Sequence, residues 1–138
     1  MLAADWPLEN LPGLKAPEYK QLLSLGLKTT QDLLRATGQS SQVLAIAKRL
    51  ELKPSYVQKW SALANLAQIP SVGCQYAGLI LHSGIVSIAQ LAEVPPVQLH
   101  RRLMRLELGL TRDRTRCPSQ AVMHQWRQEA VQILRTEP

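Results

Sequence analysis

The feature that most constrains this chain is a pattern of prolines, glycines and leucines that recurs 58 residues further along the sequence. The positions that match at this offset are apolar, glycine or helix-capping residues: Leu11 with Ile69, Pro12 with Pro70, Leu22 with Ile80, Gly26 with Gly84, Thr29 with Ser87, and Leu33 with Leu91. Agreement at so many structural positions indicates an internal duplication. We expect the 138 residues to form a single domain, 1–138, with one pseudo-repeat at residues 8–68 and a second at residues 69–135.

Helical periodicity dominates both repeats. Apolar residues return every three or four positions, which predicts amphipathic helices near residues 17–25, 42–50, 54–68, 75–83 and 119–134. The predicted fold class is therefore all-α, with two pseudo-repeats packed as one compact helical domain. Trp60 and Trp126 fall on the apolar faces of their helices, so we assign them to the core rather than to a base-stacking surface.

A tight bend precedes a helix in each repeat, at residues 11–15 and again at residues 69–73. Glycine tolerates a positive φ, and a helix start leaves backbone N–H groups bare, an arrangement that attracts phosphate. We therefore select the bend residues, with the tyrosine that follows the second bend, as candidate nucleic-acid-binding residues: Gly13, Lys15, Ser71, Gly73 and Tyr76. For Tyr76, the alternative is that the ring simply covers the bend.

The second bend and its helix, residues 69–80, resemble the helix-hairpin-helix motif, and residues 11–22 resemble a weaker copy. The layout of residues 8–135 is similar to an uncharacterised family of small tandem helix-hairpin-helix proteins, known only as a domain of unknown function. In the wider superfamily, hairpin N–H groups bind the DNA backbone without reading sequence, often beside a monovalent cation held by hairpin carbonyls. The resemblance implies the same fold here.

Each bend departs from the two-glycine pattern of that motif. Lys15 stands at the second glycine position of the first bend, and Ser71 stands at the first glycine position of the second bend. A side chain there can block the approach of a phosphate, whereas a lysine ammonium or a serine hydroxyl can add a contact. The alternative is that the bends only join helices.

Arginines gather in the second repeat, where residues 101–116 hold six of them against Glu107 and Asp113, a local charge of +4. One interpretation is a solvated charge run, and the other is a phosphate-binding patch. The candidate residues of that patch are Arg101, Arg102, Arg105, Arg112, Arg114 and Arg116. The net charge of +6 for the whole chain also favours an acidic partner.

No catalytic motif is present, so we predict a protein that is not an enzyme and has no catalytic residues. Cys117 and His124 lack the further ligands of a zinc site, and we expect no metal and no cofactor. The two cysteines show no disulfide framework, and neither a signal peptide nor an apolar run long enough for a membrane span is found, which predicts a cytoplasmic protein.

Together these features predict a non-enzymatic module that binds nucleic-acid backbone, DNA or RNA, without sequence specificity. The alternative is a protein-protein interaction adaptor with degenerate hairpins. Pseudo-symmetry also predicts that the helix at 119–134 docks beside the first bend, which lacks a long preceding helix. That docking would occur either within a monomer or by exchange in a swapped dimer.

Overall fold

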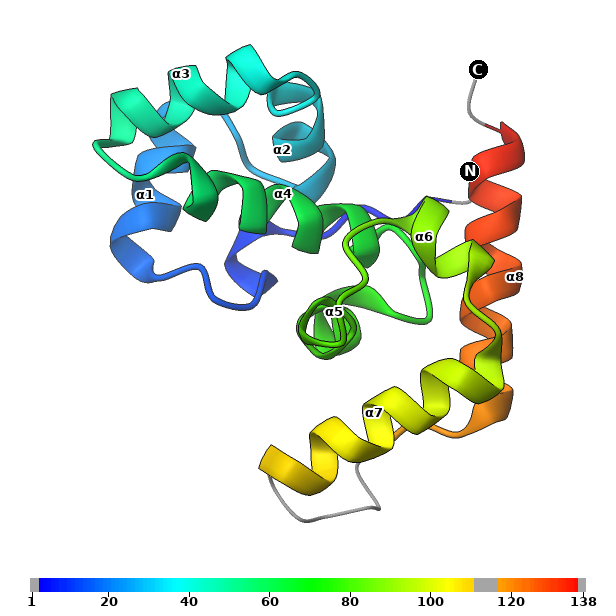
Figure 1. Cartoon of the computed structure of the whole chain (residues 1–138). Helices are drawn as coiled ribbons and strands as arrows, with labels where there is room; N and C mark the ends of the chain where they lie inside the picture. The colour runs from blue at the N-terminus through cyan, green and yellow to red at the C-terminus, as the bar shows by residue number, and fades with distance from the viewer. Residues whose placement is uncertain (1–2, 111–116, 137–138) are drawn as a thin grey trace.

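The computed structural model describes residues 3–110 and 117–136, and these residues form eight α-helices and no β-strand (Figure 1). A short 3-10 turn at Leu8–Asn10 comes first. The helices are α1 (Ala16–Ser24), α2 (Thr30–Ala36), α3 (Ser40–Leu50), α4 (Pro54–Ala67), α5 (Gly73–His82), α6 (Ile88–Glu93), α7 (Pro96–Leu110) and α8 (Gln120–Thr136). The all-α prediction is confirmed for the described part of the chain.

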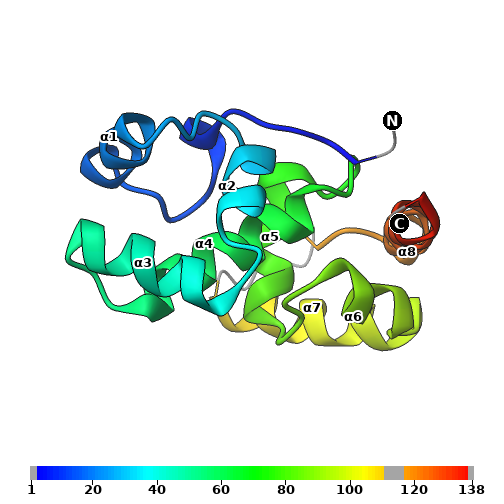
Figure 2. The ribbon, with the colours of Figure 1, turned by 90° about the horizontal axis from the view of Figure 1, so that it is seen from above.

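Helices α4 and α5 form the centre of the molecule. Helix α4 packs against α2, α3 and α5, whereas α8 packs against α6 and α7. Figures 1 and 2 show α1 and α3 on one side of this centre and α8 on the other. Trp60 of α4 and Trp126 of α8 are buried, as the sequence predicts. None of the described helices combines the length and the apolar character that crossing a bilayer would require.

Two helix starts 58 residues apart use the same capping device. The Thr29 hydroxyl accepts a hydrogen bond from the N–H of Asp32 at 3.2 Å, and the Ser87 hydroxyl accepts one from the N–H of Gln90 at 3.2 Å. In return, the side chains of Asp32 and Gln90 accept from backbone N–H groups that precede the helix. These reciprocal bonds satisfy amides that a helix start leaves bare.

The N-terminal segment is an extended lead-in that ties the first half of the chain to the end of α4. The N–H of Thr30 donates to the carbonyl of Trp6 at 2.8 Å, and the N–H of Ala4 donates to the carbonyl of Gln68 at 2.7 Å. The indole Nε1 of Trp6 donates to the carbonyl of Ala67 at 2.7 Å. Trp6 is thereby held beside the bend that follows α4.

Helix α8 does not lie where pseudo-symmetry predicts it within the chain. It packs on α6 and α7, and both views place it at the opposite end of the molecule from α1 and the first bend (Figures 1 and 2). The physical reason is that α8 has one apolar face, and its packing on α6 and α7 already uses that face. The buried residues of this face are Met123, Trp126, Ala130 and Ile133. Exchange of α8 with a partner chain stays a prediction.

Candidate nucleic-acid interface

The first bend, residues 11–15, is open. Gly13 is exposed with φ +79°, and no described atom lies within 4 Å of the position that a Cβ would take there. Leu11 is buried beneath the bend and anchors it. Pro12 rests on α5, where a Cβ added to Gly78 would lie 3.8 Å from Pro12 Cγ. The bend is thus fixed from below while its outer side faces solvent.

Two of the backbone N–H groups of this bend donate hydrogen bonds within the chain. The N–H of Leu14 donates to the carbonyl of Leu11 at 3.4 Å, and the N–H of Lys15 donates to Glu18 Oε1 at 3.2 Å. Among the described residues, none accepts a hydrogen bond from the N–H of Gly13. The Lys15 side chain is exposed at the start of α1. This exposed bend therefore carries an amide without an acceptor among the described residues and, two residues further on, an exposed lysine.

The second bend, residues 69–73, is closed from two sides. The carboxylate of Glu129 in α8 accepts two hydrogen bonds from Ser71. The N–H donates to Oε1 at 2.9 Å, and the hydroxyl donates to Oε2 at 2.6 Å. Gly73 is buried with φ +53°, the positive value predicted for it, and a Cβ there would lie 3.4 Å from the ring of Trp6. A carboxylate of the chain itself thus occupies donors that the sequence assigned to phosphate.

Tyr76 joins this closed region. Its ring lies 5.5 Å from the ring of Trp126, centroid to centroid, with the planes tilted by 47°. Tyr76 is half-buried, and its contact with Trp126 places the ring against α8. Whether it contacts nucleic acid or only covers the bend stays a prediction. The Nε1 of Trp126 is buried without a hydrogen-bond partner in the described structure. Helix α8 is thus docked both by buried apolar and aromatic side chains and by the contact of Glu129 with Ser71.

Burial raises the pKa of the neighbouring Cys74 thiol, which is half-buried in the first turn of α5. A raised pKa keeps this sulfur protonated at neutral pH and adds no negative charge to the helix start. Within the described residues, no group of three or more His, Cys, Asp or Glu side chains comes together to hold a metal ion.

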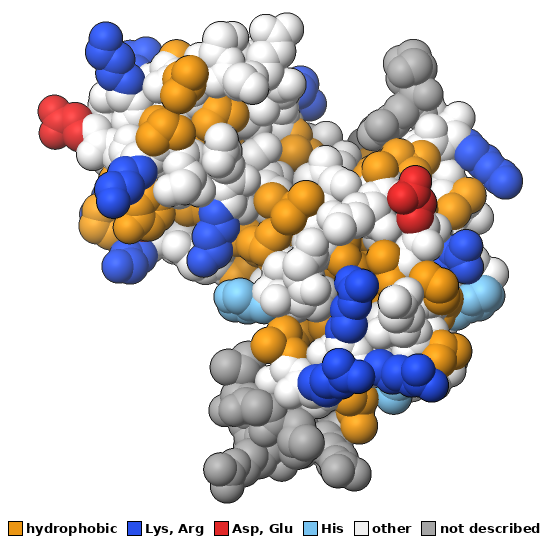
Figure 3. Space-filling view, in the orientation of Figure 1, with side chains coloured by type: hydrophobic (Ala, Val, Ile, Leu, Met, Phe, Trp, Pro, Cys, Tyr) orange, Lys and Arg blue, Asp and Glu red, His pale blue; other side chains and the backbone are white. Residues whose placement is uncertain are grey.

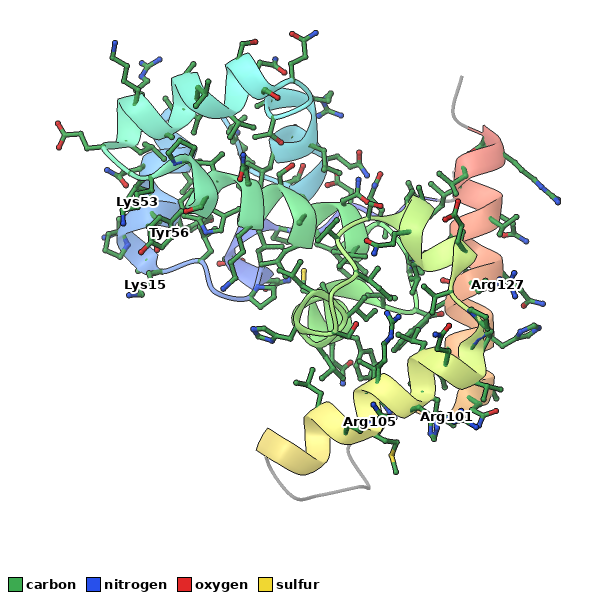
Figure 4. The ribbon with its side chains drawn as sticks, in the orientation of Figure 1. Lys15, Lys53, Tyr56, Arg101, Arg105 and Arg127 are labelled. Atoms are coloured by element: carbon green, nitrogen blue, oxygen red, sulfur yellow. The ribbon has the colours of Figure 1, made fainter. Side chains whose placement is uncertain are left out.

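The arginines of α7 lie at a different place from the first bend. Arg101, Arg102 and Arg105 are exposed on α7, and Arg101 and Arg105 are one helical turn apart. Figure 4 shows these two on the same side of the molecule as Arg127 of α8, whereas Lys15 lies at the other end. Arg112, Arg114 and Arg116 lie outside the described residues. The predicted site residues are therefore spread over separate regions of the surface.

The comparisons with known proteins agree with one part of the resemblance. The family model described as a domain of unknown function, DUF4332, matches residues 12–133. The chain belongs to this family. No curated protein matches the chain. No solved structure matches it either. Membership in DUF4332 thus brings no activity, and function has to be argued from the surface itself.

Several surface residues were missed by the sequence analysis. On the face shown in Figure 3, basic side chains gather over α7 and over the end that holds α1 and α3, and acidic ones are few. Figure 4 places Lys53, the residue before α4, and Tyr56, in the first turn of α4, at the same end as Lys15. Arg127 donates from Nε to the carbonyl of Ala92 at 3.0 Å, at the end of α6. Single basic residues on amphipathic helices carry no motif, so no sequence signal marks these positions.

Proposed function

We propose that this DUF4332 chain is a tandem helix-hairpin-helix module that binds nucleic-acid backbone through its first bend, without sequence specificity and without catalysis. The observation that carries the proposal is the open bend at Gly13, where no described residue accepts a hydrogen bond from the Gly13 N–H and where Lys15, two residues further on, is exposed. Backbone amides and lysine ammonium groups are typical phosphate contacts, and neither depends on base identity. The arginines on α7 supply a second positively charged region for a long polyanion.

In this proposal the two bends divide their roles. The first presents donors to phosphate, and the second holds α8 through the Ser71–Glu129 contact. A carboxylate on the donors of Ser71 also repels a phosphate from that position. The proposal therefore concentrates binding at residues 11–15 and on α7, and it gives Ser71, Gly73 and Tyr76 a supporting role.

Fluorescence anisotropy with a labelled random-sequence duplex tests the proposal. The titration is repeated at salt concentrations from about 20 to about 200 mM, a range that includes physiological ionic strength. Binding should weaken linearly on a log–log plot, with a slope of about −0.9 for each phosphate neutralised. Lys15→Ala should make the slope shallower by about 0.9 and lower the affinity. Arg135→Ala removes the same charge from the far end of α8 and serves as the matched control.

Further arms separate a shaped site from bare charge. The double variant Arg101→Ala/Arg105→Ala reports the part played by α7, and the triple variant Arg112→Ala/Arg114→Ala/Arg116→Ala reports the rest of the arginine run. Heparin binding as tight as duplex binding would reduce the interaction to general charge attraction. Absence of duplex binding at the lowest salt concentration would rule out the proposal.

The alternative function, a protein-interaction adaptor, is favoured by a different observation. A groove of about 410 Å³ runs between the end of α1, α2 and α3, and its walls include both apolar side chains and one arginine: Leu25, Leu27, Ala36, Ala45, Ile46 and Arg49. Apolar walls with a basic rim suit an amphipathic segment of acidic character. A stoichiometric protein complex that survives nuclease treatment and is lost on Ile46→Asp would favour this function.

A further inference from the structure

Tyr56 is the exposed aromatic residue of this surface. It lies in the first turn of α4, and 50% of its area is open to solvent. The other aromatic side chains among the described residues are half-buried or buried, and Trp60, one turn further along α4, points into the core. An aromatic ring that the core does not use is free to stack on a flat ligand.

Lysines flank this ring on both sides. Lys53 and Lys59 lie three residues before and three residues after Tyr56, and both are exposed. Lys53 is the N-cap residue of α4 and Lys59 lies in its second turn, so the two lysines lie on either side of Tyr56 along the chain. Lys15 lies at the same end of the molecule (Figure 4). Glu51 is the exposed carboxylate nearest in sequence, so the lysines outnumber it.

We infer that Tyr56, with Lys53 and Lys59, forms a stacking site for an unpaired base of a single-stranded nucleic acid. The ring takes the face of one base, and the two ammonium groups contact phosphates on either side of that nucleotide. An aromatic platform within a basic groove binds any base, because every base has a π-face. A continuous duplex hides those faces inside its stack, so this site distinguishes single strands from duplexes.

The inference rests on the proposed function, because the first bend and Lys15 are what bring a nucleic-acid backbone to this end of the molecule. It goes further by naming the form of nucleic acid that is preferred. It also assigns a role to three residues that the backbone-binding proposal does not need.

Two labelled strands of equal charge test it with the full chain: a 12-nucleotide thymidine strand, and a 12-unit abasic strand with the same phosphates but no bases. The wild-type chain should bind the thymidine strand more tightly, by roughly 5- to 100-fold, the range typical of one base stacked on one aromatic ring. Tyr56→Ala should abolish that preference and leave the salt slope unchanged, because the ring carries no charge. Tyr56→Phe keeps the stacking face and should behave as wild type.

Two further measurements keep the outcomes distinct. Lys53→Ala and Lys59→Ala should each make the single-strand salt slope shallower by about 0.7 while the preference for the thymidine strand persists. Duplex binding should not change in Tyr56→Ala. If duplex binding follows the proposed function but Tyr56→Ala still prefers the thymidine strand, this inference alone is wrong. If neither strand nor duplex binds to the wild-type chain, both proposals are wrong.

Discussion

The two bends occupy equivalent positions in the sequence, yet one is open and the other closed. Each has the same apolar frame, and each has one glycine, but at different positions: Gly13 in the first bend and Gly73 in the second. The positive φ follows the glycine in both. Lys15 is extended before α1, whereas Val72 is already helical before α5. The glycine of the second bend lies two residues later than that of the first, and the two bends therefore enter their helices with different backbone conformations.

The residue of α8 that closes the second bend, Glu129, has no acceptor at the matching position of α4. When Trp60 of α4 is aligned with Trp126 of α8, further buried positions coincide, such as Ala64 with Ala130. In this alignment, however, buried Leu63 corresponds to Glu129. A leucine accepts no hydrogen bond, so α4 offers no acceptor at this position. The acceptor that closes the second bend is therefore particular to α8.

The largest expected effect comes from removing the ring that covers the second bend. Trp6→Ala should lower the free energy of unfolding by about 3 kcal/mol, because it removes an aromatic packed on Gly73 and leaves the carbonyl of Ala67 without its indole donor. Chemical denaturation measures the change. Trp6→Phe keeps a ring and should lose about 1 kcal/mol. If Trp6→Ala loses less than about 0.5 kcal/mol, as an ordinary surface substitution does, the N-terminal segment does not stabilise the second bend.

Removing the carboxylate of the second bend should have the next largest effect. Glu129→Ala leaves both donors of Ser71 without their acceptor and should cost about 2 kcal/mol, within the range for hydrogen bonds to a charged group. Ser71→Ala removes only the hydroxyl and should cost about 1 kcal/mol. A double-mutant cycle between the two positions should give a clear coupling energy, and strictly additive losses would contradict the contact.

Alanine at the two bend glycines compares the environments directly. Both Gly13 and Gly73 have a positive φ, so Gly13→Ala should cost about 1 kcal/mol from backbone strain alone. Gly73→Ala should cost about 2 kcal/mol, because its Cβ would also press on the ring of Trp6 at 3.4 Å. Thermal unfolding of the pair measures the difference. Equal losses in the two variants would contradict the closed packing, because they would mean that a Cβ at Gly73 does not press on the ring of Trp6.

The smallest expected effect concerns pH, and it separates the two capping devices. The N–H of Lys28, followed by that of Thr29 and by the Arg35 guanidinium, lowers the pKa of Asp32 from its usual 3.8. A folded-state pKa below the unfolded value gives stability that is fully present above the unfolded value and lost as pH falls through the folded value. Gln90 holds the matching position in the second repeat and does not titrate in this range.

The urea unfolding midpoints of the wild type and of Asp32→Asn, compared from about pH 6 down to about pH 2, test this contribution of the Asp32 carboxylate to stability. The advantage of the wild type should shrink as the carboxylate is protonated. Gln90→Glu should introduce a similar acid dependence into the second repeat. A constant difference between wild type and Asp32→Asn across the range would show that the charge of Asp32 adds nothing to its capping role.

Local pattern was enough to predict much of the fold. Helix α5 was predicted at residues 75–83 and runs from Gly73 to His82, and the buried places of Trp60 and Trp126 were predicted correctly. Such features depend on contacts within one or two helical turns, where periodicity and capping residues act. The position of α8 was wrong for a monomer, because the prediction rested on symmetry rather than on which apolar faces were already covered.

By itself, the sequence determined the all-α class, the approximate extent of most helices, the glycine that takes a positive φ in the second bend, and the DUF4332 family of the chain. Only the tertiary structure decided which bend faces solvent, because that depends on Glu129 reaching Ser71 across 58 residues and on Trp6 reaching Gly73. The physical reason is that helix formation is set by near neighbours along the chain. The access of a bend to solvent is set by whichever distant side chains the packing of whole helices brings to it.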